Sequence, residues 1–238
     1  FFNTQNVWEV YNETTGNYEA EPVTTAGGVV ISWGGTDLRN SNYVSKYPNN
    51  ASFKNNNPAG LTFTATSQAL KDKFKSFGIG ITEGTDRPSN EGGSYISFNT
   101  LNDGLDAMKI SFYETGFSDI KTRLMAWKGA GTEAEKEAYA NDIIKATFWD
   151  TQNREFDNMS DLDKEKLLTQ HLKREDSALY NVLNDEMGAI REDGTLDYSL
   201  LKTNWQSSAK WFNEKINWVD VVLWAIWVPV VFERTIKS

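Results

Sequence analysis

The chain contains no cysteine and has a single histidine, His171, among its 238 residues. Without cysteine there is neither a disulfide framework nor a thiol nucleophile. One histidine excludes zinc sites built from several histidines and argues against a Ser-His-Asp hydrolase. The acidic residues do not show the alternating spacing of a calcium loop. The sequence therefore predicts no metal site and no cofactor.

Positive charge is also scarce, with 24 Lys and Arg against 33 Asp and Glu and a formal net charge of −9. This balance disfavours nucleic acid and anionic lipid surfaces as partners. Aromatic residues, by contrast, are plentiful, including nine Trp and nine Tyr. Such side chains serve carbohydrate-facing clefts and protein interfaces as well as ordinary cores, and composition alone favours the core.

Long hydrophobic runs are missing too. The most apolar segment, residues 218–232, contains Asp220 and Pro229 and is shorter than the ~20 residues of a membrane-spanning helix. We expect this segment to be buried against the rest of the chain or to contact another subunit. No signal peptide is visible, and a start at Phe1 rather than methionine indicates a fragment or a processed form.

The pattern along the chain predicts a mostly α (α+β) protein in three parts. Residues 1–52 are rich in Asn, Thr, Gly and Tyr, and we expect an irregular or β-rich arm with a strand over residues 29–33. Residues 53–190 are expected to form a helical domain with a small β element, including a short strand at 95–98 and a loop over 79–94. Residues 191–238 would form a C-terminal helical segment that ends in the apolar tail.

Helices in the central part are predicted from capping residues followed by apolar residues three or four positions apart. Four such segments begin near Thr100, Ser118, Thr132 and Ser160. Glu135 follows Thr132 at the spacing of a capping box. The residues expected on the inward faces of these helices are Leu101, Leu105, Met108, Phe112, Ile120, Leu124, Trp127, Ala138, Phe148, Leu167, Leu168, His171 and Leu172.

Several short motifs follow one another between residues 53 and 180. They are Asn56-Asn57-Pro58-Ala59-Gly60, Phe98, Asp103-Gly104-Leu105-Asp106-Ala107, Trp127 and Ala138-Tyr139. Their order and spacing resemble a module of phage structural proteins and secreted bacterial proteins that is similar to the lysozyme and lytic-transglycosylase superfamily. The loop at residues 87–95 is similar to that of the secreted bacterial version. The resemblance covers about half of the chain and implies a lysozyme-like helical domain.

The resemblance also implies a substrate, peptidoglycan, and cleavage of the bond between N-acetylmuramic acid and N-acetylglucosamine. Such an enzyme needs a carboxylic acid, held partly dry so that its pKa is raised, to protonate the glycosidic oxygen. In the common chain order this glutamate precedes the Asn-Pro turn, yet residues 27–57 contain no glutamate. The helix at 167–175 resembles a downstream helix of some phage members, which makes Glu175 the general acid of a permuted domain.

The same resemblance supplies candidate substrate-binding residues. Asn57 would donate a hydrogen bond to a saccharide, Glu91 would rim the cleft beside Glu83, and Tyr95 and Tyr139 would stack on sugar faces. Each has an alternative structural role. Asn57 can simply shape its turn, Glu91 can be a turn residue beside two glycines, and Glu175 can belong to a solvated helix face.

These observations predict a virion-associated or secreted muramidase or lytic transglycosylase, located in a virion or at the cell surface. The transglycosylase is favoured because one carboxyl group suffices when the sugar's own 6-hydroxyl attacks. The alternative is a non-enzymatic structural protein of a phage particle or surface layer, which docks its neighbours through residues 1–52 and 218–232. If the domain is permuted, Glu175 and the Asn57-Pro58 turn should lie across one cleft.

Overall fold

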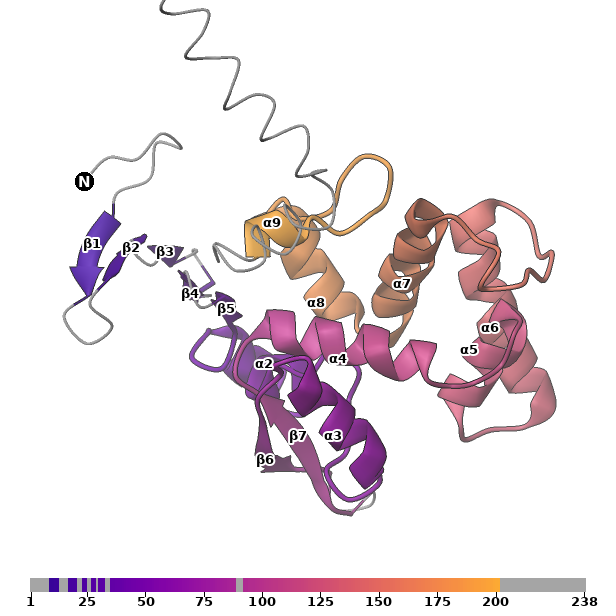
Figure 1. The fold of residues 1–238 in the computed structure, drawn as a ribbon, viewed down its shortest axis with the longest axis horizontal. Coiled ribbons are helices and arrows are strands. Elements are labelled where there is room, and N and C mark those ends of the chain that lie inside the picture. The colour runs from indigo at the N-terminus through magenta and orange to yellow at the C-terminus, as the bar shows by residue number, and fades with distance from the viewer. Residues whose placement is uncertain are drawn as a thin grey trace, which may run out of the picture. The chain divides into compact units, whose positions relative to one another are not determined.

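The computed structural model describes residues 9–12, 17–20, 23–24, 27–28, 30–32, 35–88 and 92–201. All of them belong to one compact unit, Phe1–Thr203. The expectations for Glu91 and for the apolar tail at 218–232 fall outside these residues. Within them the protein is mostly helical with small antiparallel sheets (Figure 1), which confirms the predicted fold class.

The strands form short antiparallel sheets. The first pairs β1 with β2, the second has the order β3-β4-β5, and the third pairs β6 with β7. Their bounds are Glu9–Asn12 (β1), Asn17–Ala20 (β2), Val23–Thr24 (β3), Val30–Ser32 (β4), Gly35–Asp37 (β5), Ile81–Asp86 (β6) and Ser94–Phe98 (β7). The strand expected at 95–98 is therefore present as β7.

The prediction of a loop over residues 79–94 is wrong, because it contains β6. The register of the hairpin pairs Ile81 with Phe98 and Glu83 with Ile96. Apart from Ile81, the residues of β6 are polar or glycine, so the strand lacks the apolar alternation from which strands are predicted. Pairing with β7 stabilises it instead, which a local pattern does not reveal.

Helices α2 to α8 begin at capping side chains. Their bounds are Tyr43–Lys46 (α1), Ala51–Asn55 (α2), Gln68–Ser76 (α3), Leu101–Tyr113 (α4), Ile120–Lys128 (α5), Glu133–Phe148 (α6), Asp161–Glu175 (α7), Ser177–Asn181 (α8) and Tyr198–Leu201 (α9). A π-helical turn, Val182–Glu186, follows α8. The capping box of Thr132 and Glu135 is confirmed, whereas α5 is capped by Asp119 and not by the expected Ser118.

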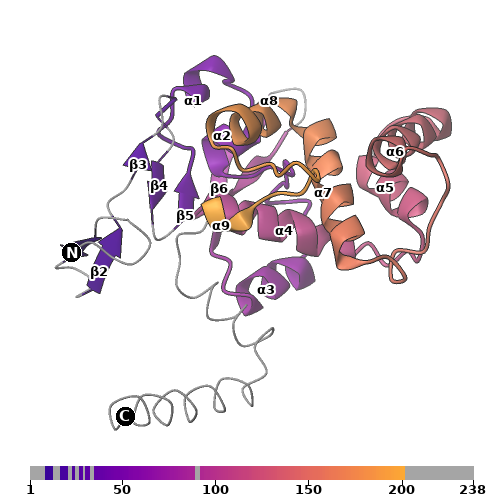
Figure 2. The same ribbon diagram turned by 90° about the horizontal axis from the view of Figure 1, so that it is seen from above.

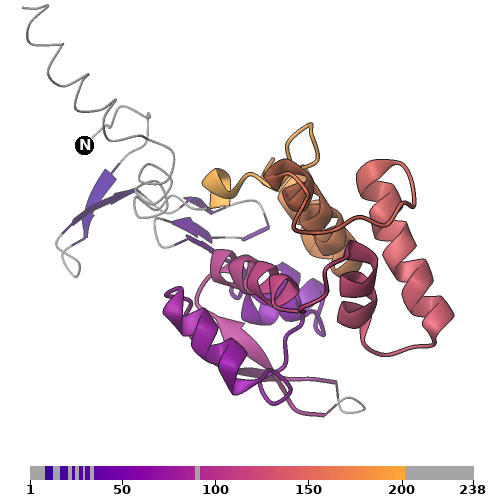
Figure 3. The ribbon, with the colours of Figure 1, turned by 45° about the vertical axis from the view of Figure 1, so that its right-hand side comes forward.

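The long helix α4, which lies near the middle of the ribbon in Figure 2, contributes to three hydrophobic clusters. Leu105 and Met108 pack in a cluster with α2 and α8, and Phe112 packs in a second cluster with α5, α6 and α7. Ala107 faces a third cluster formed with α3 and the β6–β7 hairpin, which lie together on one side of α4 (Figure 3). Burying one large apolar side chain contributes about 2 kcal/mol, so these clusters hold α4 at the centre of the described fold.

One inward-facing residue differs from the prediction. Ala138 is exposed, while its neighbours Tyr139 and Ala140 are buried together with Ile143 and Ile144. The positions 139, 140, 143 and 144 form one continuous helical stripe. The buried face of α6 is therefore shifted by about one residue from the predicted face, and this shift places Tyr139 against α7.

The turn after α2 is held by three buried asparagines, Asn55, Asn56 and Asn57. Asn55 binds β6, since its Nδ2 donates to Thr85 Oγ1 (2.8 Å) and its Oδ1 accepts from the Thr85 N–H (2.9 Å). Asn56 caps α2 in the left-handed conformation, with φ 51°, and its Oδ1 accepts from the Leu38 N–H (2.9 Å). The turn thus joins α2 to the hairpin and to the end of β5.

Candidate functional site

Helices α6 and α7 bring together two of the predicted site residues. The Tyr139 hydroxyl donates a hydrogen bond to Oε1 of Glu175, which lies 36 residues further along the chain. Tyr139 lies in the middle of α6 and Glu175 is the last residue of α7, so the contact joins the two helices. Tyr139 is buried, whereas Glu175 is exposed.

The electrostatics of this pair keep the phenol protonated. Burial raises the pKa of Tyr139 far above its usual range, and the neighbouring Glu175 carboxylate raises it further. Cations surround the tyrosine ring, with the Arg174 guanidinium carbon 5.8 Å and Lys128 Nζ 5.9 Å from its centroid. The result is an exposed carboxylate held by a neutral hydroxyl donor, with two cations near the tyrosine ring and Arg174 also paired with Asp142.

His171 packs against the ring of Tyr139, the buried member of this pair. It lies one helical turn before Glu175 and is fully buried against three aromatic rings. Its ring centroid is 4.8 Å from that of Trp127, 5.3 Å from Phe112 and 6.2 Å from Tyr139. Neither imidazole nitrogen has a hydrogen-bond partner within the described part of the chain. Burial lowers the pKa of His171 to about 3, so the ring is neutral at physiological pH.

Asp176 attaches the end of α7 to α2. Its Oδ2 accepts hydrogen bonds from Ser52 Oγ (2.6 Å) and Asn50 Nδ2 (2.9 Å), and its Oδ1 caps α8 by accepting from the Leu179 N–H (2.9 Å). The late helix therefore returns to the early helix that precedes the Asn57 turn. Sequence reasoning missed this residue, although an aspartate directly before a helical segment is a recognisable capping signal.

Asn57 lies at the opposite end of α2 and faces the protein interior. Both hydrogens of its amide are engaged, by the carbonyl oxygens of Leu61 and Ile96, each at 2.8 Å. Its Oδ1 accepts from the Leu61 N–H at 3.0 Å, and the residue is fully buried. Asn57 is therefore a turn residue and not an open saccharide donor, because no amide hydrogen remains for a ligand.

Tyr95 lies on β7, in the hairpin that packs with α3. It is half-buried, and the Arg87 guanidinium carbon lies 5.9 Å from its ring centroid. Glu83 on the partner strand accepts a hydrogen bond from Ser94 Oγ (2.6 Å). In the described ranges, no hydrogen bond or ring contact joins Tyr95 or Asn57 to the Tyr139–Glu175 pair. The structure thus unites two of the predicted site residues, and Glu91 lies outside its described part.

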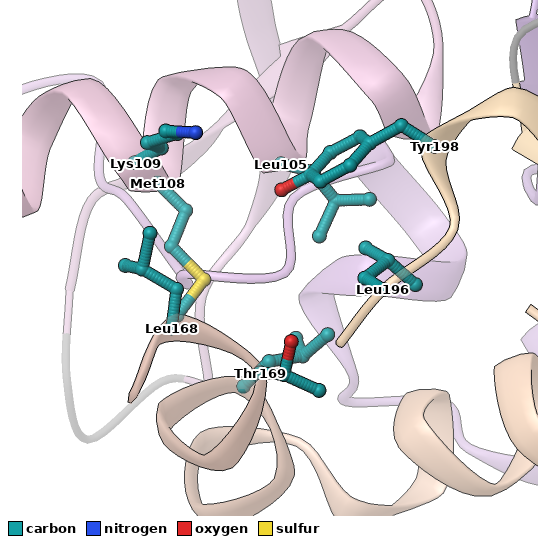
Figure 4. A pocket seen from close by; sticks show the side chains of 8 residues that line it. Leu105, Met108, Lys109, Leu168, Thr169, Leu196 and Tyr198 are labelled. Atoms are coloured by element: carbon teal, nitrogen blue, oxygen red, sulfur yellow. The ribbon is translucent and has the colours of Figure 1, made fainter. Parts of the chain in front are cut away.

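A small cavity of about 10 Å³ lies between α4, α7 and α9 (Figure 4). This volume holds about one water molecule. Its lining residues are Leu105, Met108, Lys109, Leu168, Thr169, Leu172, Leu196 and Tyr198. Beside it Lys109 pairs with Glu165, and burial raises the pKa of Tyr198. Neither Tyr139 nor Glu175 lines this cavity, which is too small for a sugar.

Residues 9–201, apart from the gaps given above, offer neither a metal site nor a membrane-spanning helix. No cluster of three or more histidine, aspartate or glutamate side chains there could hold a metal ion. None of the helices in that part of the chain has the length and apolar character needed to cross a bilayer. The Tyr139–Glu175 pair, with the buried His171 beside it, is the candidate functional site.

No family model, no curated protein and no solved structure matches the chain.

Proposed function

We propose that the protein is a peptidoglycan-cleaving muramidase or lytic transglycosylase in which Glu175 is the general acid. One observation carries this proposal, the hydrogen bond from Tyr139 to Glu175. The motif resemblance assigns both residues to one site although they are 36 residues apart. A folded chain that joins them independently of that resemblance supports the assignment.

The proposed chemistry needs one carboxyl group. Protonated Glu175 gives its proton to the glycosidic oxygen as the bond to the anomeric carbon breaks. In the transglycosylase version, the 6-hydroxyl of the same sugar attacks that carbon, and the Glu175 carboxylate takes the hydroxyl proton. The Tyr139 hydroxyl holds the carboxylate in position throughout, because its raised pKa keeps it a donor. A sugar bound over the exposed carboxyl group would displace water from it.

A second candidate is a non-enzymatic structural protein of a phage particle or surface layer. Two features favour it, the exposure of Glu175 and the engagement of both Asn57 amide hydrogens. In this reading the Tyr139–Glu175 bond only fastens α6 to α7. Residues 1–52 and 218–232 remain the segments proposed to dock neighbouring proteins. Either function places the protein in a virion or at a cell surface.

The test uses the full chain and purified peptidoglycan sacculi, with released products identified by mass spectrometry. We expect wild type to release anhydro-muropeptides and Glu175→Gln to release none, since glutamine has no proton to give. Glu133→Gln is the matched control, because Glu133 is an exposed glutamate on the neighbouring helix α6. Equal release by wild type and Glu175→Gln would refute the role of Glu175. Release by neither protein would favour the structural candidate.

A further inference from the structure

Trp149, directly after α6, is an outlier in two independent respects. Its side chain is 91% exposed, whereas the other exposed large apolar residues among those described lie between 43% and 56%. Its backbone has φ 65° and ψ 9°, the left-handed conformation in which glycine is the usual residue after a helix. Both features work against stability, and a strained, exposed residue indicates a functional role.

The backbone around Trp149 is held firmly. The Trp149 N–H donates to the Lys145 carbonyl oxygen (2.9 Å), which closes the last turn of α6. The following loop is fastened to the start of α5, since the Ile120 N–H donates to the Arg154 carbonyl oxygen (2.9 Å) and the Lys121 N–H donates to Asn153 Oδ1 (3.0 Å). The indole is therefore presented on a preorganised support, which lowers the entropy cost of binding.

The surroundings of the indole are polar. Asp150 and Arg154 form a two-pronged ion pair, with Nη1 and Nη2 of Arg154 3.0 and 2.8 Å from the two carboxylate oxygens. The Arg154 guanidinium also lies over the Phe148 ring, 4.1 Å from its centroid, and Phe148 is partly buried. The exposed residues that follow, from Asp150 to Asn153, are all polar. The apolar surface is thus confined to one flat ring beside hydrogen-bonding groups.

This geometry points to a pyranose sugar as the ligand. A protein interface buries about 800 Å² on each partner, far more than the ~150–250 Å² that one tryptophan offers. A nucleobase would also stack on the ring, but the net charge of −9 disfavours nucleic acid. A sugar has one apolar C–H face that matches an indole, and hydroxyl groups at its edge that match the polar rim.

We propose that Trp149 is a sugar-stacking platform that binds glycan strands at a place separate from Glu175. Trp149 follows Tyr139 by ten positions along the chain, so the two lie about 15 Å apart along the α6 axis. The platform rests on the proposed function only in its choice of glycan, and it is tested by binding and not by cleavage. Stacking on Trp149 would hold the same glycan strand that Glu175 cleaves.

The experiment compares wild type with Trp149→Gly and Phe77→Ala as full chains. Glycine suits the left-handed backbone, so Trp149→Gly should fold at least as well as wild type. The probes are sedimentation with peptidoglycan sacculi and titration with a soluble N-acetylglucosamine hexamer. We expect Trp149→Gly to bind about tenfold more weakly. Phe77→Ala, which removes another exposed ring, should bind like wild type.

The outcomes separate the two proposals. Equal binding by wild type and Trp149→Gly overturns the platform, as does the absence of binding by wild type to both probes. If wild type binds the glycan more tightly than Trp149→Gly but cleaves no peptidoglycan, the platform is supported and the catalytic role of Glu175 is removed. Equal weakening by Phe77→Ala and Trp149→Gly would show nonspecific adhesion through exposed rings and would also overturn the platform.

Discussion

The asparagine turn after α2 and the histidine beneath Glu175 are both fully buried polar groups, but their partners differ completely. Asn56 accepts from the Leu38 N–H and donates to Asp37 Oδ1 (3.1 Å) and to the carbonyl oxygens of Phe98 and Asn99 (both 3.3 Å). His171 is surrounded by aromatic rings, and both of its nitrogens lack a partner in the described part of the chain.

The difference shows that a buried polar group can stabilise or destabilise the fold, depending on whether it has hydrogen-bond partners. A buried amide with all its partners stabilises the fold and specifies one arrangement of the chain. A buried imidazole without partners loses its hydrogen bonds to water and gains none, which costs about 1–3 kcal/mol. We therefore expect substitutions in the turn to destabilise the protein and an apolar substitution at His171 to stabilise it.

The largest effect is expected from Asn56→Ala. The change leaves the Leu38 N–H and the Phe98 and Asn99 carbonyl oxygens without their side-chain partner, and puts alanine at φ 51°. The free energy of unfolding should fall by about 4 kcal/mol, measured by urea denaturation. The control is Asn42→Ala, an exposed asparagine whose side chain makes no capping bond, which should change stability by less than about 0.5 kcal/mol. Similar losses in both variants would mean that the turn network contributes little.

Next in size is Gly104→Ala. A β-carbon at residue 104 would lie 1.9 Å from the Asn56 carbonyl oxygen and 2.7 Å from Pro58 Cδ, so α4 and the turn must separate. We expect the free energy of unfolding to fall by about 3 kcal/mol. Helix propensity alone predicts the opposite sign, a gain of about 1 kcal/mol. A more stable Gly104→Ala protein would therefore show that the close approach of α4 to the turn is not essential.

The third prediction concerns acid and His171. In the unfolded chain the histidine pKa is near 6.5, and in the folded chain it is about 3. Between these values the unfolded state binds a proton that the folded state does not, so stability falls as pH falls from 6.5 towards 3. Between pH 7 and pH 5 this one group should cost about 2 kcal/mol.

His171→Met tests that contribution, because methionine fills irregular apolar space and does not titrate. We expect it to raise the free energy of unfolding by about 1 kcal/mol at pH 7. It should also remove the extra loss of about 2 kcal/mol at pH 5. Denaturation curves of both proteins at the two pH values provide the comparison, in which the carboxylates common to both cancel. Identical pH dependence in wild type and His171→Met would contradict the prediction.

The smallest effect on stability is expected from Tyr139→Phe. The ring keeps its contact with His171, and the exposed Glu175 carboxylate exchanges the lost hydroxyl for water. The free energy of unfolding should change by only about 0.5 kcal/mol. If Glu175 is the general acid, peptidoglycan cleavage should fall roughly tenfold because the carboxylate is no longer oriented. A variant with full cleavage activity would show that Tyr139 has no positioning role.

Local signals predicted the main helices well. The Thr132–Glu135 capping box begins α6 as expected, and the helix expected to begin near Thr100 is α4, Leu101–Tyr113. Caps and apolar spacing act within a few residues, so they can be read from the chain directly. Strand β6 was not predicted because its stability comes from pairing with β7 and from Asn55, which is 30 residues from Thr85.

In the candidate site, too, some features could be predicted from local sequence and others depended on the fold. The order of the motifs was enough to single out Tyr139 and Glu175, but it left open whether Asn57 shapes a turn or meets a sugar. Only the folded structure shows that Asn57 donates both amide hydrogens to the carbonyl oxygens of Leu61 and Ile96. Asp176 and Trp149 had no place in the motif pattern. Their roles depend on contacts and exposure that arise after packing.

The sequence by itself determined the helical class, the principal helix starts and the absence of thiol chemistry, because these follow from residue type and from interactions within one or two turns. Tertiary structure decided which buried polar groups are satisfied, since each of the three asparagines finds partners on distant strands while His171 finds only rings. It also decided that Tyr139 meets Glu175, because that contact requires α6 and α7 to pack against each other. Hydrogen-bond partners are set by the position of the whole chain, and no local pattern contains that information.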